Sequence, residues 1–200
     1  YNEFYGPSNA TVVIAGDIDF DETKQLVERW FGEIKPNENI IEKPEVRLVT
    51  LSETKKLYHL DKSAQLPQLS LTFHSVEQFS KDSYALNTLG ELLSNGRNSV
   101  FYKEIIEKQQ LAPSASAYNY SSEIAGQFSM SVRANANTSL NDIYDAIMQS
   151  LANFEANGVS DNDLKRIKAG QETAFYNSIS TNLSKARQLG FYNEYAGDPG

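Results

Sequence analysis

Two histidines, His59 and His74, come nearest to supporting chemistry, because an imidazole can act as a general base or as a zinc ligand. They lie fifteen positions apart on two separate predicted strands, at residues 56–60 and 68–76, and no glutamate stands at ligand spacing on a helix. A zinc site in a protein needs three or four converging side chains. Each histidine instead follows the alternation of a surface strand, so we predict no metal site and no catalytic residue in this chain.

An acidic run after the first predicted strand has the spacing of a calcium-binding loop. Asp17, Asp19, Asp21 and Glu28 fall at positions 1, 3, 5 and 12 of that spacing. Position 6, where glycine permits the sharp turn, is Glu22, and the apolar periodicity of a helix continues through the segment. We therefore interpret these acids as capping groups at the positive end of a helix dipole, with Asp19 or Asp21 as the cap.

No other pattern supports a specific chemistry. The turn at Gly96-Arg97 is not a glycine-rich phosphate cradle, and the sequence contains no G-x-S-x-G nucleophile elbow. The sequence leaves a Ser/His/Asp triad open, because its members need to meet only in the fold. Substrate-binding residues stay unassigned. Two pairs of carboxylates are interpreted as helix caps and solvated surface: Asp161 with Asp163, and Glu194 with Asp198.

Composition bounds the class of protein. The chain has 200 residues, of which 40% are hydrophobic and 22% charged, as in an ordinary globular domain with a core of its own. A net charge of −8 argues against nucleic acid as a partner, since phosphates attract a basic surface. Cysteine is absent, which excludes disulfides and thiolate metal sites. No apolar run is long enough for a transmembrane segment.

The elements that must position these residues begin with residues 5–32. The β-branched run at residues 11–14 predicts a short buried strand, and Gly16 ends it. An amphipathic helix follows, and Gly32 is placed to stop it.

The rest of the chain alternates between strands and helices in blocks. Residues 46–51, 56–60 and 68–76 are candidate strands, and residues 114–121 and 127–134 predict an antiparallel pair that turns through 122–126. Helices are predicted from Asp82 to about residue 94, from 99 to 110, from a cap at Ser139 to 157, and from Ser160 onward with a break at 180–182. This is an α+β pattern, with one sheet and helices on one face.

The ordered series of motifs resembles the insulinase/pitrilysin family of zinc metallopeptidases. It opens with YGPSNATVVIAGDID and a helix ending in WFGEI, and continues with DKSAQLPQLSLTF. ELLSNGRNSVFYKEIIEKQQLAPSASAY, GQFSMSVRANANTSLNDI and KAGQETAFYNSIS follow. The resemblance implies the fold of mitochondrial processing peptidase: a linker at residues 1–8, then one α+β domain at 9–200. It implies a mostly antiparallel sheet of about five or six strands with helices on one face, ending in a long αα-hairpin.

The resemblance also implies where the metal lies. Family catalysis uses an inverted H-x-x-E-H motif on a helix and a downstream glutamate, with the glutamate of the motif as general base. The inverted motif does not occur in this chain. The expectation is therefore no cofactor in this fragment, zinc in the parent protein, and a zinc site in a domain upstream of Tyr1. The fragment alone is expected to be inactive.

One family comparison indicates which half of the parent this is. C-terminal halves carry an Arg and, seven residues later, a Tyr that reach the substrate. The matching positions here are Ile106 and Pro113, whose side chains cannot donate a hydrogen bond. The resemblance thus favours the second domain of the N-terminal half. The alternative is a C-terminal half that has lost the pair.

The expected function is that of a scaffold and chamber-wall domain in a zinc metalloendopeptidase that hydrolyses peptides or small unfolded proteins. The alternative is a non-catalytic structural or partner-binding subunit of the same fold. The expected partners are the upstream zinc-binding domain, the other half of the protein or a partner subunit, and peptide substrates. The resemblance is closest to bacterial envelope members, so the expected location is the periplasm or cell envelope of a bacterium.

Overall fold

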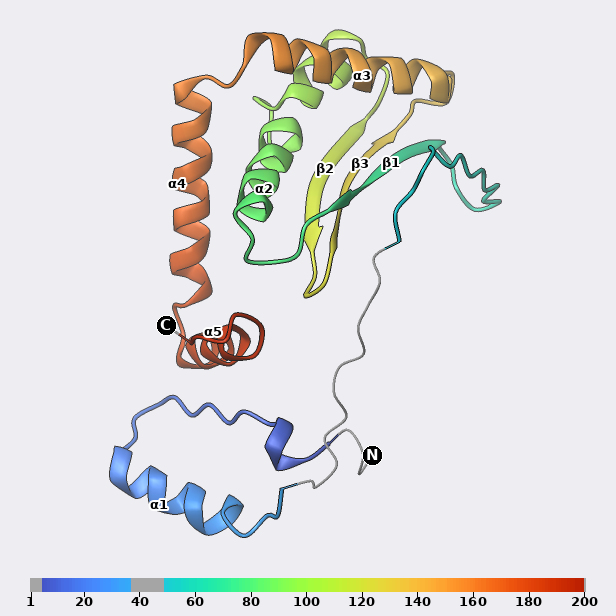
Figure 1. Ribbon diagram of the computed structural model, residues 1–200. Coiled ribbons are helices and arrows are strands. Elements are labelled where there is room, and N and C mark those ends of the chain that lie inside the picture. The colour runs from blue at the N-terminus through green and yellow to red at the C-terminus, as the bar shows by residue number, and fades with distance from the viewer. Residues whose placement is uncertain (1–4, 37–48, 200) are drawn as a thin grey trace. The chain divides into compact units, whose positions relative to one another are not determined.

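The computed structural model describes residues 5–36 and 49–199 (Figure 1). The chain divides into two compact units, one comprising Tyr1–Val46 with Gln171–Gly200 and the other Arg47–Gly170. Each unit is described by itself.

The larger unit is built on a three-stranded antiparallel sheet. Its strands are β1 (Gln68–Ser75), β2 (Ser114–Ser121) and β3 (Gly126–Arg133), and their order β1-β3-β2 places β3 in the centre. The turn between β2 and β3 is short, so these two strands form a hairpin, as the sequence predicts. The hydroxyl of Ser121 donates to the Val76 carbonyl oxygen at 2.7 Å and links this turn to the end of β1.

Strand alternation gives the sheet an apolar face and a polar face. Met130 at the centre of β3 lies opposite Leu71 on β1 and Ala117 on β2. The residues between these positions are mostly serine and threonine, and they point to the other side of the sheet. The period-two pattern that predicts β1 therefore also determines which face the helices cover.

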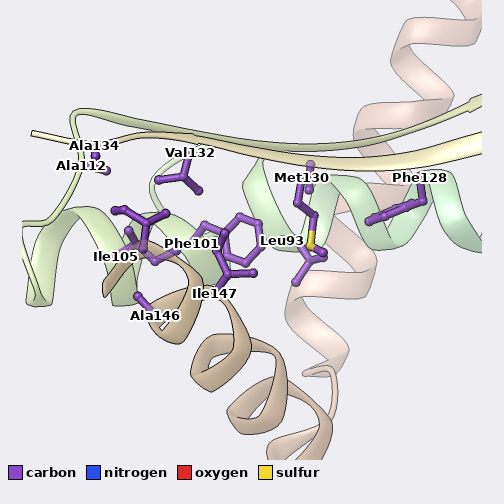
Figure 2. Close-up of a cluster of buried hydrophobic side chains, with 12 residues drawn as sticks. Leu93, Phe101, Ile105, Ala112, Phe128, Met130, Val132, Ala134, Ala146 and Ile147 are labelled. Atoms are coloured by element: carbon purple, nitrogen blue, oxygen red, sulfur yellow. The ribbon is translucent and has the colours of Figure 1, made fainter. Parts of the chain in front are cut away.

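Three helical segments lie against the apolar face (Figures 1 and 2). They are α2 (Lys81–Ser94), the π-helix η2 (Tyr102–Lys108) and α3 (Leu140–Asn157). Figure 2 shows the strand side chains directed toward those of the helices. Full burial of each large apolar side chain contributes about 1.5–3 kcal/mol to folding. The fully buried core residues include Leu93, Phe101, Ile105, Val132, Ile143 and Ile147.

Helix starts follow the capping chemistry in the sequence. Ser139 caps α3 by accepting a hydrogen bond from the Asp142 amide, as predicted. For α2 the cap is Ser80, which accepts from the Ser83 amide, whereas the sequence favoured Asp82. Both residues are good caps, and Ser80 serves because it is the one with extended backbone angles.

The smaller unit contains the short 3-10 turn η1 (Pro7–Asn9), α1 (Phe20–Phe31) and α5 (Asn182–Tyr195). Thr181 caps α5 in a reciprocal box with Ser184, which confirms the predicted helix break at 180–182. The Asn193 side chain donates to the hydroxyl of Thr11 at 3.1 Å and ties α5 to the N-terminal segment. A further helix, α4 (Asp161–Ser178), runs from one unit into the other.

The sheet of five or six strands and the final hairpin are not confirmed. Residues 11–14 and 56–60 lie among the described residues but pair with no strand there, and 46–51 falls partly outside them. A β-branched run indicates that a segment favours extended backbone. It becomes a strand only when another strand forms hydrogen bonds with its backbone amides and carbonyls. Helix α3 packs on η2 and β1 in the larger unit.

We predict that Gly126→Ala destabilises the protein by about 1–3 kcal/mol. A Cβ atom there would lie 2.6 Å from the Val76 carbonyl oxygen and 2.7 Å from that of Tyr120, both on the backbone. The matched control is Gly170→Ala, a helix position with nothing within 4 Å, where alanine should stabilise by about 0.5–1 kcal/mol. Urea denaturation followed by circular dichroism measures both changes in the free energy of unfolding. Equal stability of Gly126→Ala and the unsubstituted protein would contradict the close packing at Gly126.

Candidate functional site

The two histidines lie apart from any metal-binding arrangement. His74 is exposed on β1 opposite Gln127, and His59 is exposed outside any helix or strand. Among residues 5–36 and 49–199, no group of three or more His, Asp or Glu side chains is placed to hold a metal ion. In the same residues neither histidine is hydrogen-bonded to a serine, so the structure does not assemble the triad that the sequence left open.

The acidic run at residues 17–28 is a helix start. Asp19 accepts a hydrogen bond from the Glu22 amide at 2.9 Å, and its carbonyl oxygen accepts from the Thr23 amide. The helix α1 then occupies the positions that a calcium loop would need to bend. The interpretation as capping is confirmed. Asp161 and Asp163 likewise lie in the first turn of α4.

The passage from η2 to β2 holds the two positions that carry the Arg and Tyr in C-terminal halves of the resembled family. Ile106 is half-buried on the π-helix, whose geometry shows in the bond from the Gln109 amide to the Glu104 carbonyl oxygen. Gln110 follows with a left-handed φ of 53°, and Pro113 is exposed just before β2. Neither Ile106 nor Pro113 offers a side-chain hydrogen-bond donor here.

The polar face of the sheet is a surface of hydroxyl groups. Ser70 and Ser131 are hydrogen-bonded at 2.8 Å, and Thr72 and Ser129 at 3.4 Å, with Ser129 itself buried. Tyr118 lies on the same face of β2 and is 50% exposed. Such a face offers hydrogen bonds and aromatic contact to an extended peptide without a charged group at its centre. We call these residues, with Ser116 and Tyr120, the hydroxyl face.

A cavity of about 270 Å³ lies between η2 and the link that joins α3 to α4. We call it the η2–α4 pocket. Its floor is apolar, and its rim carries both signs of charge together with carboxamides. The lining includes Leu92, Asn98, Val100, Lys103, Glu104, Asn153, Phe154, Asn157, Val159, Ser160, Asp163 and Arg166.

The charges on the rim are arranged in ion pairs within single helices. Arg166 contacts Asp163 at 3.4 Å, and Glu104 contacts Lys108, which lies outside the lining, at 3.0 Å. The Ser160 hydroxyl donates to the Asp163 carboxylate at 2.7 Å and is the main cause of the lowered pKa of Asp163. The charges of Arg166 and Lys103 lower this pKa further.

The fold and the site together define a class of protein. This is an α+β domain whose sheet is covered by helices on one face and bears hydroxyl groups on the other. Residues 1–171 match the family described as the peptidase M16 inactive domain, and the chain belongs to that family. The resemblance to insulinase- and pitrilysin-type zinc peptidases is thereby confirmed.

Comparison with known proteins places the chain within longer relatives. It is 23% identical over 198 residues to the zinc protease PqqE of Helicobacter pylori, which covers 96% of this chain and 43% of the relative. A solved protease structure from H. pylori matches with a TM-score of 0.75 and 20% identity over 98% of this chain and 48% of that one. Pitrilysin matches with a TM-score of 0.62 and 16% identity over 90% and 20%. The chain thus spans less than half the length of these three relatives.

Sequence reasoning missed the η2–α4 pocket. Its lining comes from α2, the segment before η2, η2 itself, α3 and α4, which are separated by long stretches of sequence. A mixture of Lys, Glu, Asn and Val has no spacing that sets it apart from ordinary surface. The hydroxyl face, in contrast, had a signal in the alternation of Ser and Thr along β1.

We predict a pH-dependent contribution of Asp163 to stability. Because its pKa is lowered in the folded chain, its contribution is present above the unfolded value near 3.8 and is lost as the pH falls through the folded value. Asp163→Asn should therefore lower the free energy of unfolding at neutral pH, by less than about 1 kcal/mol since the carboxylate is exposed, and the difference should vanish in acid.

Urea denaturation at several pH values between about 7 and 3 measures this difference. The control is Asp161→Asn, which removes a carboxylate of the same helical turn, one to which no side chain within residues 5–36 and 49–199 is hydrogen-bonded. If the difference in unfolding free energy between Asp163→Asn and the unsubstituted protein grew in acid, it would contradict the lowered pKa of Asp163.

Proposed function

We propose that this chain is a scaffold and chamber-wall domain of a zinc metalloendopeptidase that hydrolyses peptides or small unfolded proteins. The observation that carries the proposal is the match of residues 1–171 to the inactive domain of the M16 peptidases. In this proposal the zinc site belongs to a domain upstream of Tyr1. The chain contributes shape and contact surface, not a reacting group, and is inactive alone.

The hydroxyl face supports the role of a chamber wall. A wall that contacts peptides of many sequences should offer hydrogen bonds without selecting one charge, and hydroxyl and phenol groups provide this. The Ser70–Ser131 and Thr72–Ser129 contacts join β1 and β3 in two pairs; Ser129 is buried, and the other three hydroxyl groups are open to a ligand. The opposite face of the sheet is occupied by the core, so the hydroxyl face is the side of the described sheet that is open to substrate.

Exposed apolar side chains support docking on other domains. On α1, Phe20 is 77% exposed and Trp30 is 67% exposed, although both belong to the amphipathic helix that the sequence predicts. An apolar surface of this kind is typical of an interface. We propose that the partners are the upstream zinc-binding domain and the other half of the protein or a partner subunit.

The finer features of the domain belong to the same proposal. Leu57 and Leu60 are 91% and 87% exposed in a segment predicted as a strand, which is unfavourable unless the segment is paired and covered. We propose that residues 11–14 and 56–60 complete a sheet of about five or six strands in one domain at 9–200. We propose that this domain follows a linker at 1–8, belongs to the N-terminal half of the parent protein, and ends in a long αα-hairpin.

We propose a location in the periplasm or cell envelope of a bacterium, as the family resemblance suggests. Among the described residues, no helix is both long enough and apolar enough to cross a membrane. Cell fractionation of the native host, followed by immunoblotting for the full-length protein, tests this location. Recovery with the cytoplasmic marker would overturn it.

We predict that the full-length protein carries zinc and that replacing both histidines of this chain leaves the zinc in place. The double variant His59→Ala/His74→Ala should keep its zinc content and its rate of hydrolysis of a quenched fluorescent peptide within about twofold, because neither imidazole is a ligand. Elemental analysis and initial rates measure the two quantities.

Two further results would decide between alternatives. Loss of zinc in the double variant would place the metal in this chain and overturn the scaffold assignment. A full-length protein without zinc or peptidase activity would favour the alternative, a non-catalytic structural or partner-binding subunit of the same fold. The isolated 200-residue chain should neither retain zinc nor hydrolyse the peptide.

A further inference from the structure

We propose that the η2–α4 pocket binds the free carboxyl end of a peptide whose last side chain is apolar. The inference goes beyond the scaffold role, because it concerns a pocket formed within one unit of this chain and needs neither zinc nor another domain. It rests on the shape of the pocket, its apolar floor and the distribution of charge on its rim.

The size of the pocket suits the end of a chain. Its volume of about 270 Å³ lies below the range of about 300–1,000 Å³ that is usual for sites of drug-sized ligands. One or two terminal residues therefore fit, while a longer segment would continue out into solvent. The pocket lies wholly within the Arg47–Gly170 unit, so its shape does not depend on the other unit.

The floor of the pocket is apolar and partly accessible. Leu92 is almost buried at 9% exposure, whereas Val159 at the rim is 44% exposed. Val100 and Phe154, both half-buried, complete the floor. Binding of an apolar ligand group to this exposed apolar surface is favourable, because it removes the surface from water. A leucine-like side chain is the ligand group that this floor selects.

One cation on the rim, the Lys103 ammonium, belongs to neither of the two ion pairs there. Glu104 is paired with Lys108 and Asp163 with Arg166, each pair within its own helix. The structure gives the Lys103 ammonium no hydrogen bond or ion pair within the described part of the chain. A ligand carboxylate therefore gains a new ion pair at Lys103, while a ligand ammonium would have to compete with Lys108 or Arg166.

The rim also directs the carboxylate to one place. The Asp163 carboxylate is held by Ser160 and Arg166 and also experiences the charge of Lys103, and it repels a second carboxylate beside it. A ligand carboxylate is therefore expected on the side of the Lys103 ammonium that faces away from Asp163. Asn98 lines the same pocket with a carboxamide that can bond to the backbone amide of the ligand.

We predict that N-acetylleucine binds the full chain saturably and shifts amide NMR signals of the pocket residues, among them Lys103, Val159 and Ser160. N-acetylleucinamide, which lacks the charge, should bind about twofold to fivefold more weakly. N-acetylglycine, which lacks the side chain, should bind at least fivefold more weakly. A fourth probe, the α-amide of N-acetylaspartic acid, keeps a free side-chain carboxylate and distinguishes a chain end from an internal acidic residue.

Substitutions then test the assigned residues. Lys103→Gln should weaken N-acetylleucine about twofold to fivefold, since Lys103 is exposed, whereas Lys168→Gln, an exposed lysine of α4 outside the pocket lining, should leave binding unchanged. Val159→Ser should remove the preference for leucine over glycine while the charge preference stays. The same spectra show whether each variant is folded.

Three results would overturn the proposal: no saturable shift, equal binding of N-acetylleucine and its amide, or equal effects of Lys103→Gln and Lys168→Gln. Tighter binding of the α-amide of N-acetylaspartic acid than of N-acetylleucine would reassign the pocket to an acidic side chain. Because binding is read without hydrolysis, these outcomes are separate from the presence of zinc in the full-length protein.

Discussion

The apolar face of β3 is the constraint on which the larger unit depends. Figure 2 shows Val132 directed toward Phe101 and Met130 directed toward Leu93. The central strand therefore packs against the start of η2 and against α2, with Ile147 of α3 in the same buried cluster. Because β3 also pairs with β1 and β2 along its two edges, loss of this packing would free the central strand from the helices, while β2 would still contact α2. The hydroxyl face exists because the opposite face is filled.

This arrangement separates stability from contact with other molecules. Apolar side chains between the sheet and the helices hold the unit together, and the groups available to a ligand lie on the outer side of the sheet and at the end of the α3–α4 link. A domain of this kind can change its contact surface without changing its core. That is the property expected of a scaffold, and it agrees with membership of the inactive-domain family.

The sequence predicted those elements whose signals are local. Residues 114–121 form β2 with the predicted bounds, and the Ser139 cap and the helix break before α5 follow from side-chain chemistry within a few residues. The strand at residues 11–14 could not be settled in the same way, since it requires a partner elsewhere. The π-helix and the pocket were equally out of reach, because the first depends on a shifted hydrogen-bond register and the second on five separate segments meeting.

The strand order has a consequence for synthesis on the ribosome. Ser70 on β1 and its partner Ser131 on β3 are 61 positions apart, so at about 5–20 residues per second β1 leaves the ribosome roughly 3–12 seconds before its partner exists. β2 precedes β3 by only one short turn, so its pairing partner is synthesised almost immediately after it. During that interval the nascent chain carries a half-apolar strand with both edges open, the state most prone to pairing with another copy.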